Sequence, residues 1–255
     1  MSVRTLRPSS RLLSLLVPKT TLSRPPQRHF LFNPLESSTQ TVEAHRTLPY
    51  STLDVYTIIA DIESYPRFLP YCRKANITEW SQKDPHYNRT WPQEAVLTVG
   101  YGDTLTESFG SRVFCSPPVP EQGRAGIGIV EAVSGQTDAQ MDEGLVKHHD
   151  HKPREHDEFE KHPSSIPGGS PLAMLQTRWT VKNFMFKPGP AGGYKAQEEG
   201  VKPQGEVKQM TDVSLSIKFK FKSPVYEMMA KAVTPRLADV MIDAFEKRVK
   251  SLLDK

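Results

Sequence analysis

The chain has 255 residues, of which 37% are hydrophobic and 24% are charged, a composition typical of a protein that folds around one substantial core. Its two cysteines, Cys72 and Cys115, are too few for a disulfide framework, and neither stands in a CxxC or catalytic signature. The net charge of +4 is modest and unevenly spread. We therefore expect one domain with appendages, carrying ordinary thiols.

Residues 1–30 have the composition of a mitochondrial presequence. The first 35 residues hold six cations, many hydroxyl side chains and no acid before Glu36. The apolar run at 12–17 is far shorter than the roughly 20 residues that span a bilayer. A basic tail that binds anionic surfaces is the alternative. Taking these six cations from the net +4 leaves about −2 for the remainder, so the sequence gives little support for binding nucleic acid.

The first elements of the folded region are a strand and two short helices. Residues 42–48 alternate like a strand, and Ser51 then begins a helix with Asp54 three residues on, which resembles a capping box. The following stretch, DIESYPRFLPYC at 61–72, contains Pro66 and Pro70 and predicts a second short helix with a turn.

A series of strands follows, separated mostly by polar or Gly/Pro-rich connections. The predicted strands are 74–80, 94–101, 104–114, 126–133, 172–186 and 206–222. In the last one, apolar residues at 213, 215, 217, 219 and 221 alternate with serine and lysine, which indicates a sheet with one buried and one wet face. The lysine stripe is typical of a solvated face, and it also suits anionic lipid headgroups.

An apolar stripe from Val225 to Leu252 predicts one long amphipathic helix with a break or kink at Pro235. Such a helix needs a broad apolar partner, which the antiparallel sheet supplies. The order of strand, two short helices, antiparallel strands and terminal helix is that of an α+β helix-grip fold. In this fold a curved sheet wraps around the last helix and leaves an apolar cavity between them.

The segment from about 134 to 171 interrupts the strands and holds a histidine-rich tract, KHHDHKPREHDEFEKH at 147–162. Five of the eight histidines lie in it, and His-rich tracts can bind metals. However, no ligand spacing of a structural or catalytic metal site is present, and the segment is nearly free of apolar residues. We interpret it as a disordered insertion and predict no metal site.

Five stretches carry a resemblance to a known family. They are LPYSTLDVYTIIADIESYPRFLPYC, VLTVGYGDTLTESFGSRV, LQTRWTV, VSLSIKFKFKSPVYEMMA and LADVMIDAFEKRV. In order and spacing the chain resembles the mitochondrial coenzyme Q-binding proteins of the START-like, polyketide-cyclase-related superfamily. The resemblance runs from about Ala44 to Leu252, outside 134–171 and 187–205, and implies a START-like domain over 41–255. Tyr71, where tryptophan is more usual, and Pro235 depart from the pattern.

The resemblance implies a non-catalytic protein without a cofactor. It would bind coenzyme Q (ubiquinone) or its polyprenyl intermediates and deliver them in support of respiration and quinone biosynthesis. The implied location is the matrix face of the mitochondrial inner membrane, as a peripheral protein, with quinone biosynthetic or respiratory enzymes as further partners. An enzyme of the cyclase or aromatase kind, or a general phospholipid-binding protein using the same cavity, is the alternative. No GxSxG, P-loop or GxGxxG motif occurs, and the inward rows are expected to be almost wholly apolar.

In such a fold the 61–72 stretch forms a stiff lip at the cavity rim, with Phe68 and Leu69 as its apolar part. Tyr65, Tyr71 and Tyr101 are the candidate donors to a quinone head, and the sequence does not choose among them. The remaining predicted lining residues are Val99, Trp179, Ile217, Phe219, Met241 and Phe245. Arg67, Arg73 and Lys74 flank the lip as predicted membrane contacts. For each lining residue, a plain core position is the alternative interpretation.

Overall fold

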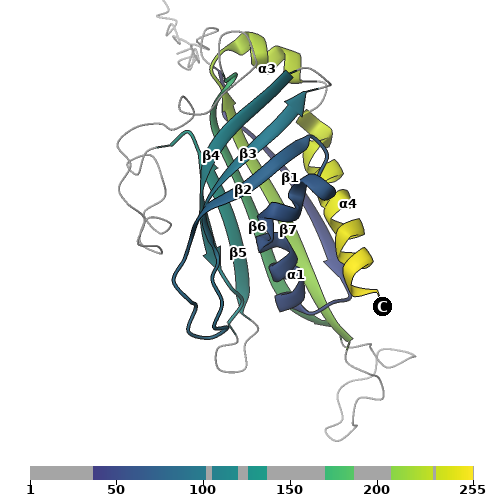
Figure 1. The fold of residues 1–255 in the computed structure, drawn as a ribbon. Coiled ribbons are helices and arrows are strands. Elements are labelled where there is room, and N and C mark those ends of the chain that lie inside the picture. The colour runs from purple at the N-terminus through teal and green to yellow at the C-terminus, as the bar shows by residue number, and fades with distance from the viewer. Residues whose placement is uncertain are drawn as a thin grey trace, which may run out of the picture. The chain divides into compact units, whose positions relative to one another are not determined.

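The computed structural model describes residues 37–101, 105–119, 126–136, 170–186, 208–231 and 234–254, all of which belong to one compact unit, Pro34–Lys255. The predicted presequence, nearly all of the histidine-rich insertion and the 187–205 loop lie outside these residues. Seven strands of the described chain form one antiparallel sheet in the order β1-β7-β6-β5-β4-β3-β2 (Figure 1). The strands are β1 (Gln40–Leu48), β2 (Cys72–Trp80), β3 (Pro92–Tyr101), β4 (Leu105–Ser116), β5 (Ile127–Ser134), β6 (Leu172–Phe186) and β7 (Lys208–Phe221).

Alternation along the strands sets the two faces of the sheet. In β7, Leu215 and Ile217 are buried on one face, and they pair with Trp179 and Thr177 of β6 in register. Lys218, which follows Ile217, is exposed on the other face. This is the predicted half-buried strand, and the predicted strands agree with the structure to within two residues at each end.

The first two helices follow β1. They are α1 (Thr52–Ala60) and the 3-10 helix η1 (Ile62–Arg67). The predicted capping box is wrong, because the Ser51 side chain makes no capping hydrogen bond at the start of α1. The helix is instead held by burial of its apolar face, which includes Val55, Tyr56 and Ile59.

Close approach of α1 to the sheet requires a glycine on β5. A Cβ atom at Gly128 would lie 2.6 Å from Val181 Cγ2 on β6 and 2.7 Å from Tyr56 Cδ2 on α1. The Tyr56 hydroxyl reaches over the strand and donates to the Ile129 carbonyl at 3.4 Å. Thus α1 lies directly on the sheet at this strand.

The C-terminal stripe forms two helices, which agrees with the break or kink predicted at Pro235. These are α3 (Pro224–Ala230) and α4 (Thr234–Leu253). Pro235 explains the break, since its ring excludes the preceding helical turn, whereas proline is tolerated in the first turn of the next helix. The expectation that the whole stripe packs on the sheet is wrong, because α3 buries no residue.

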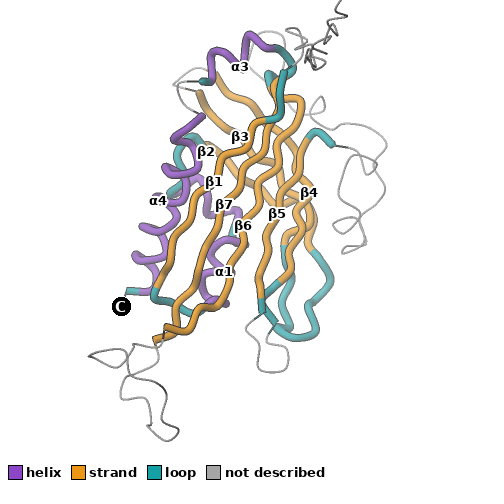
Figure 2. Tube along the Cα trace, turned by 180° about the vertical axis from the view of Figure 1, so that it is seen from behind, coloured by secondary structure: helices purple, strands orange, loops and turns teal. Residues whose placement is uncertain are grey.

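Helix α4 carries the buried half of the stripe. Ala238, Ile242, Phe245 and Val249 recur at helical spacing and are buried. Figure 2, seen from behind the sheet, shows α4 and α1 beyond the same face of the strands. The structure therefore confirms the α+β class, with an antiparallel sheet and a C-terminal helix packed on it. Within the described part of the chain, no helix combines the length and apolarity needed to cross a bilayer.

Candidate functional site

The proline-containing stretch after α1 forms a tight turn fixed by its own backbone. The amides of Phe68 and Leu69 both donate to the Tyr65 carbonyl, at 3.1 and 2.8 Å. The Tyr65 side chain is buried, and its hydroxyl donates to the Ile59 carbonyl at 2.5 Å, near the end of α1. Within the predicted 61–72 stretch, we restrict the name lip to residues 66–71 from here on; the lip is anchored on α1 through Tyr65.

Four aromatic rings lead from the lip into the core. Tyr65 and Phe68 meet edge to face with ring centroids 5.7 Å apart. Phe68 lies 6.4 Å from Phe245 on α4, and Phe245 lies 5.0 Å from Trp179 on β6. Of the four, Phe68 alone is half-buried, and the other three are buried. These predicted lining residues therefore come together as one continuous apolar path from the surface to the sheet.

A groove of about 810 Å3 separates the lip from α4. Phe68 and Leu69 line it on one side, and Val240 and Ala244 line it on the other. Leu69 is buried beneath the groove, whereas Val240 is exposed. The groove thus has an apolar floor and opens beside the ring of Phe68.

The charged residues along this groove are mainly cations. Arg67, Lys247 and Arg248 line it together with one acid, Asp243. The Arg248 guanidinium carbon lies 5.9 Å from the Phe68 ring centroid, within reach of a cation–π contact. The Arg248 Nε is buried without a hydrogen-bond partner among the described atoms. The groove therefore offers a cationic rim above an apolar floor.

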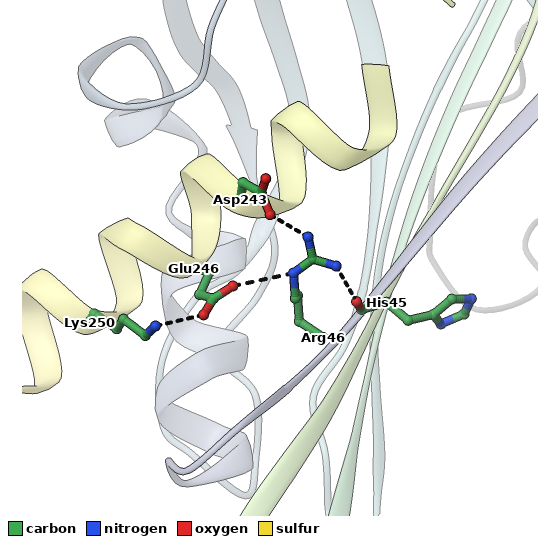
Figure 3. A network of polar contacts seen from close by, with 5 residues as sticks. All are labelled: His45, Arg46, Asp243, Glu246 and Lys250. Atoms are coloured by element: carbon green, nitrogen blue, oxygen red, sulfur yellow. Dashed lines mark hydrogen bonds and ion pairs between the residues drawn. The ribbon is translucent and has the colours of Figure 1, made fainter. Parts of the chain in front are cut away.

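An ion-pair network ties the other side of α4 to the edge strand β1 (Figure 3). Arg46 of β1 donates from Nη2 to Asp243, and its Nε lies 3.3 Å from Glu246 Oε2. Its Nη1 also donates to the His45 carbonyl at 2.7 Å. Lys250 extends the network to Glu246 at 2.7 Å. Because Asp243 also lines the groove, this network holds the α4 wall of the groove in position.

The other predicted lining residues differ in how deeply they are buried. Ile217 and Phe219 are buried on the face of the sheet toward α4, in the same hydrophobic cluster as Trp179 and Phe245. Val99 and Met241 are half-buried and pack against that cluster. The Tyr101 side chain lies outside the described residues.

Tyr71 and the predicted membrane contacts lie at the surface. Tyr71 is 49% exposed and has a φ of 66°, a backbone conformation that aromatic residues rarely adopt. Its carbonyl accepts from the Gly100 amide at 2.8 Å, which joins the lip to the end of β3. Arg67, Arg73 and Lys74 are exposed around it. Arg73 covers Gly100, where a Cβ atom would lie 2.6 Å from its Nε.

A buried carboxylate on the inward face is a functional candidate that the sequence analysis missed. Glu107 is fully buried, pairs with Val99 across β3 and β4, and accepts a hydrogen bond from the Ser170 hydroxyl. The expectation of almost wholly apolar inward rows is therefore wrong at this position. The sequence contains a signal that could have identified Glu107. Every second residue of a strand points to the same face, so Glu107 belongs to the inward row Leu105, Glu107, Phe109, Ser111 and Val113.

A second buried carboxylate, Glu131 on β5, lies on the opposite face of the sheet. It accepts a hydrogen bond from Gln176 Nε2, and its Oε2 lies 3.6 Å from Arg178 Nη1. In the described ranges no three His, Cys, Asp or Glu side chains are grouped so that they could hold a metal ion. The histidine-rich tract lies outside those ranges.

Burial makes both cysteine thiols weak acids. Desolvation raises the pKa of Cys72, next to the lip, to about 11, and that of Cys115 on β4 to about 12. A thiol with such a pKa stays protonated near neutral pH and is a poor nucleophile. Neither cysteine therefore suits covalent chemistry at this site.

A family model described as polyketide cyclase / dehydrase and lipid transport matches residues 48–246, a span that contains the lip, strands β2 to β7 and most of α4. The chain belongs to this family. The mitochondrial coenzyme Q-binding protein of Schizosaccharomyces pombe is 36% identical over 74 residues, which cover 29% of this chain and 42% of that protein. The Eremothecium gossypii protein of the same name is 25% identical over 198 residues, covering 78% of this chain and 66% of that protein. The chain thus spans no more than about two thirds of these relatives.

Among solved structures, a START superfamily protein from Mycobacterium smegmatis aligns with a TM-score of 0.45 and 14% identity. The alignment covers 83% of this chain and 98% of that one. The Zhui aromatase/cyclase from a Streptomyces species aligns with a TM-score of 0.43 and 13% identity, over 84% of this chain and 94% of that one.

Proposed function

We propose that this protein binds coenzyme Q or its polyprenyl intermediates without catalysis and delivers them to enzymes of respiration or quinone biosynthesis. The observation that carries the proposal is the aromatic path from Phe68 at the lip to Trp179 on the sheet, which opens at a groove with an apolar floor. The names of the aligned relatives, which are mitochondrial coenzyme Q-binding proteins, support the choice of ligand and a mitochondrial location.

The physical properties of a polyprenyl tail suit such a path. Exposing an apolar chain to water costs about 0.8 kcal/mol per CH2 group, so a long tail does not diffuse freely between membranes and enzymes. A groove that continues into an apolar core lets the tail move from lipid to protein without that exposure. The affinity of the protein for the tail therefore has only to match the affinity of the bilayer for the same tail.

The proposed contacts divide between tail and head. The tail would lie against the lip and the inward face of the sheet, and displacement of Phe68 from Phe245 would open the path. Tyr71 and Tyr101 are the proposed head-group donors, because the hydroxyl of Tyr65 already serves the Ile59 carbonyl. The full proposed binding set is Tyr65, Phe68, Leu69, Tyr71, Val99, Tyr101, Trp179, Ile217, Phe219, Met241 and Phe245.

The proposed setting is the matrix face of the mitochondrial inner membrane, where the protein would be peripheral. The exposed cations Arg67, Arg73 and Lys74 around the lip suit an anionic membrane surface. Loading from the bilayer and delivery to a membrane-bound enzyme would then occur at the same face. No cofactor and no nucleic acid enter this scheme.

The test is organic extraction and mass spectrometry of the full chain purified from cells that make ubiquinone. We expect a stoichiometric polyprenyl quinone in the wild type and a marked loss in Phe68→Lys. A control is Trp80→Lys, which changes a more exposed aromatic residue at the far end of β2. Recovery of phospholipid alone, or an unchanged quinone content in Phe68→Lys, would overturn the proposal.

Glu107 favours a second candidate function, acid–base chemistry of the cyclase kind. A buried carboxylate on the inward face, hydrogen-bonded by Ser170, is a group that such chemistry requires. The variant Glu107→Gln keeps the shape and an acceptor oxygen but cannot take up or release a proton. Carriage predicts an unmodified quinone in both proteins, whereas catalysis predicts a converted ligand in the wild type only.

A further inference from the structure

Helix α3 presents an apolar face that the described protein does not cover. Val225, Met228 and Met229 are 58, 65 and 72% exposed. Their spacing places them on one side of the helix, as an amphipathic helix requires. Exposed apolar residues are common singly, but three adjacent ones on a single short helix mark a contact surface.

The helix is held so that this face stays outward. The Ser223 hydroxyl caps it by accepting from the Val225 amide at 3.3 Å. On another side, Glu227 accepts hydrogen bonds from the Ser38 amide at 3.1 Å and from the Ser38 hydroxyl at 2.8 Å. The polar side of α3 is therefore fixed to the segment before β1, which leaves the methionines free.

The exposed Tyr71 belongs to the same end of the sheet. Helix α3 follows β7 after Phe221, and Tyr71 joins the end of β3 through Gly100. Because neighbouring strands are antiparallel, the ends of β3 and β7 and the beginnings of β1 and β2 all lie at one end. Figures 1 and 2 both show α3 beyond this end. The groove reaches it too, since Pro70 lines the groove directly before Tyr71.

The described charged residues next to α3 and Tyr71 are mainly positive. Lys222 and Lys231 flank α3 and are exposed, as is Lys74 after Tyr71. The described segments 68–74 and 222–231 contain one acidic residue, Glu227. Its carboxylate accepts a hydrogen bond from the Ser38 hydroxyl. An apolar face flanked by lysines complements a membrane surface, in which anionic headgroups cover an apolar interior.

We propose that α3 and Tyr71 form the surface by which this protein docks on a bilayer containing anionic lipids. Val225, Met228, Met229 and Tyr71 enter the interface, while Lys222, Lys231 and Lys74 contact the headgroups. This deepens the proposed function, on which it rests for the idea that the ligand comes from a membrane. It also orients the molecule, because Tyr71 directly follows Pro70, which lines the groove.

Methionine suits this role. Its flexible and polarizable side chain adapts to irregular apolar surroundings, and burying one such side chain favours the buried state by more than tenfold. Each lysine near an anionic surface adds roughly a further fivefold. The short helix supplies few apolar residues, so the expected binding is reversible, as a carrier that must leave the membrane requires.

The test measures flotation of the full chain with vesicles of phosphatidylcholine containing a minor fraction of phosphatidylglycerol. The double variant Met228→Glu with Met229→Glu should lower the partition coefficient at least tenfold. Lys222→Glu with Lys231→Glu should lower it by a similar factor, and pure phosphatidylcholine should bind the wild type weakly. The matched controls are Ile127→Glu and Lys83→Glu, which change exposed residues at the opposite end of the sheet and should bind as the wild type does.

A second measurement locates the insertion directly. Met229→Trp should show tryptophan fluorescence quenched by brominated lipid, whereas the wild type, whose three tryptophans lie elsewhere, should show much less quenching. Circular dichroism of every variant checks that the fold is kept. Wild-type binding by the double methionine variant, or equal loss in the Ile127 control, would overturn the proposal. So would a wild-type dimer in the absence of lipid that the methionine variant converts to monomer, since the face would then bind a second copy.

Failure of this inference differs from failure of the proposed function. Quinone content is measured by extraction, and vesicle binding is measured on quinone-free vesicles. A chain that carries quinone but floats equally well with altered methionines would overturn the docking surface alone. A chain that docks through α3 but yields no quinone would overturn the carriage alone.

Discussion

The ring of Phe68 on the lip lies 6.4 Å from the ring of Phe245 on α4, and this contact closes the described path into the protein. Phe245 is fully packed against Trp179, whereas Phe68 is half-buried and borders the groove. Of the two rings, Phe68 is therefore the more exposed, and we expect any opening of the lip to begin with its side chain.

Phe68→Lys should therefore impair ligand binding more than stability. The substitution loses the contacts with Tyr65 and Phe245 and places a charge beside Arg248, which together should cost about 1–2 kcal/mol of unfolding free energy. Leu69→Lys should cost more, about 2–5 kcal/mol, because Leu69 is buried and its replacement buries a charge. Urea titration of both variants gives the comparison. A larger loss in Phe68→Lys would show that Phe68 serves the core rather than the opening.

The Arg46–Asp243 contact should make a small contribution to stability. Both side chains are partly exposed, at 32 and 51%, so a double-mutant cycle with Arg46→Met and Asp243→Asn should give a coupling of about 1 kcal/mol or less. The Lys250–Glu246 pair, one helical turn apart, should give only about 0.3–0.5 kcal/mol. Hydrogen exchange should report the loss of Arg46 as faster exchange in α4, and unchanged exchange would count against the network as a support of the groove wall.

Gly128 should be intolerant of any side chain. In Gly128→Ala the new methyl group meets Val181 and Tyr56 at distances that require one of them to move, which should cost about 1–3 kcal/mol. Thermal unfolding of Gly128→Ala measures the cost. The matched variant is Gly128→Ala with Val181→Ala, in which one obstacle is removed. The double variant should lose less than the sum of the two single losses, and simple additivity would argue against this contact as the cause.

The strands were predictable because their signal is local. Alternation in β7 predicts its burial, and its bounds are predicted to within two residues. The break near Pro235 was predictable from proline geometry, but the exposure of α3 was not, since Met228 and Met229 continue the apolar stripe of α4 in sequence. Whether a stripe meets the sheet depends on tertiary placement, which periodicity does not contain.

The candidate site was predictable in part. The lip and the aromatic residues stand in recognisable stretches, yet the pairing of Phe68 with Phe245, 177 positions apart in the numbering, follows only from packing. Glu107 was missed although the alternation of β4 places it inward, because a charged residue in an apolar row is unexpected without its partner Ser170. The predicted capping role of Ser51 is wrong because tertiary packing, which the sequence pattern does not show, holds the helix: the buried face of α1 stabilises it without a side-chain cap.

The cysteines should make stability fall at alkaline pH. Both thiols have a folded pKa above the ordinary value of 9.0, about 11 for Cys72 and about 12 for Cys115, owing to desolvation. Below pH 9 both are neutral in the folded and unfolded states, and their contribution is fully present. Above pH 9 the unfolded chain releases these protons first, so stability declines until pH passes the folded pKa, by up to about 1.4 kcal/mol per pH unit for the buried Cys115 and by less for the partly exposed Cys72. Urea titrations between pH 8 and about pH 9.5, where most tyrosine side chains of the unfolded chain are still neutral, measure this slope. Cys115→Ser should reduce it, and an unchanged slope would exclude the buried thiol as its source.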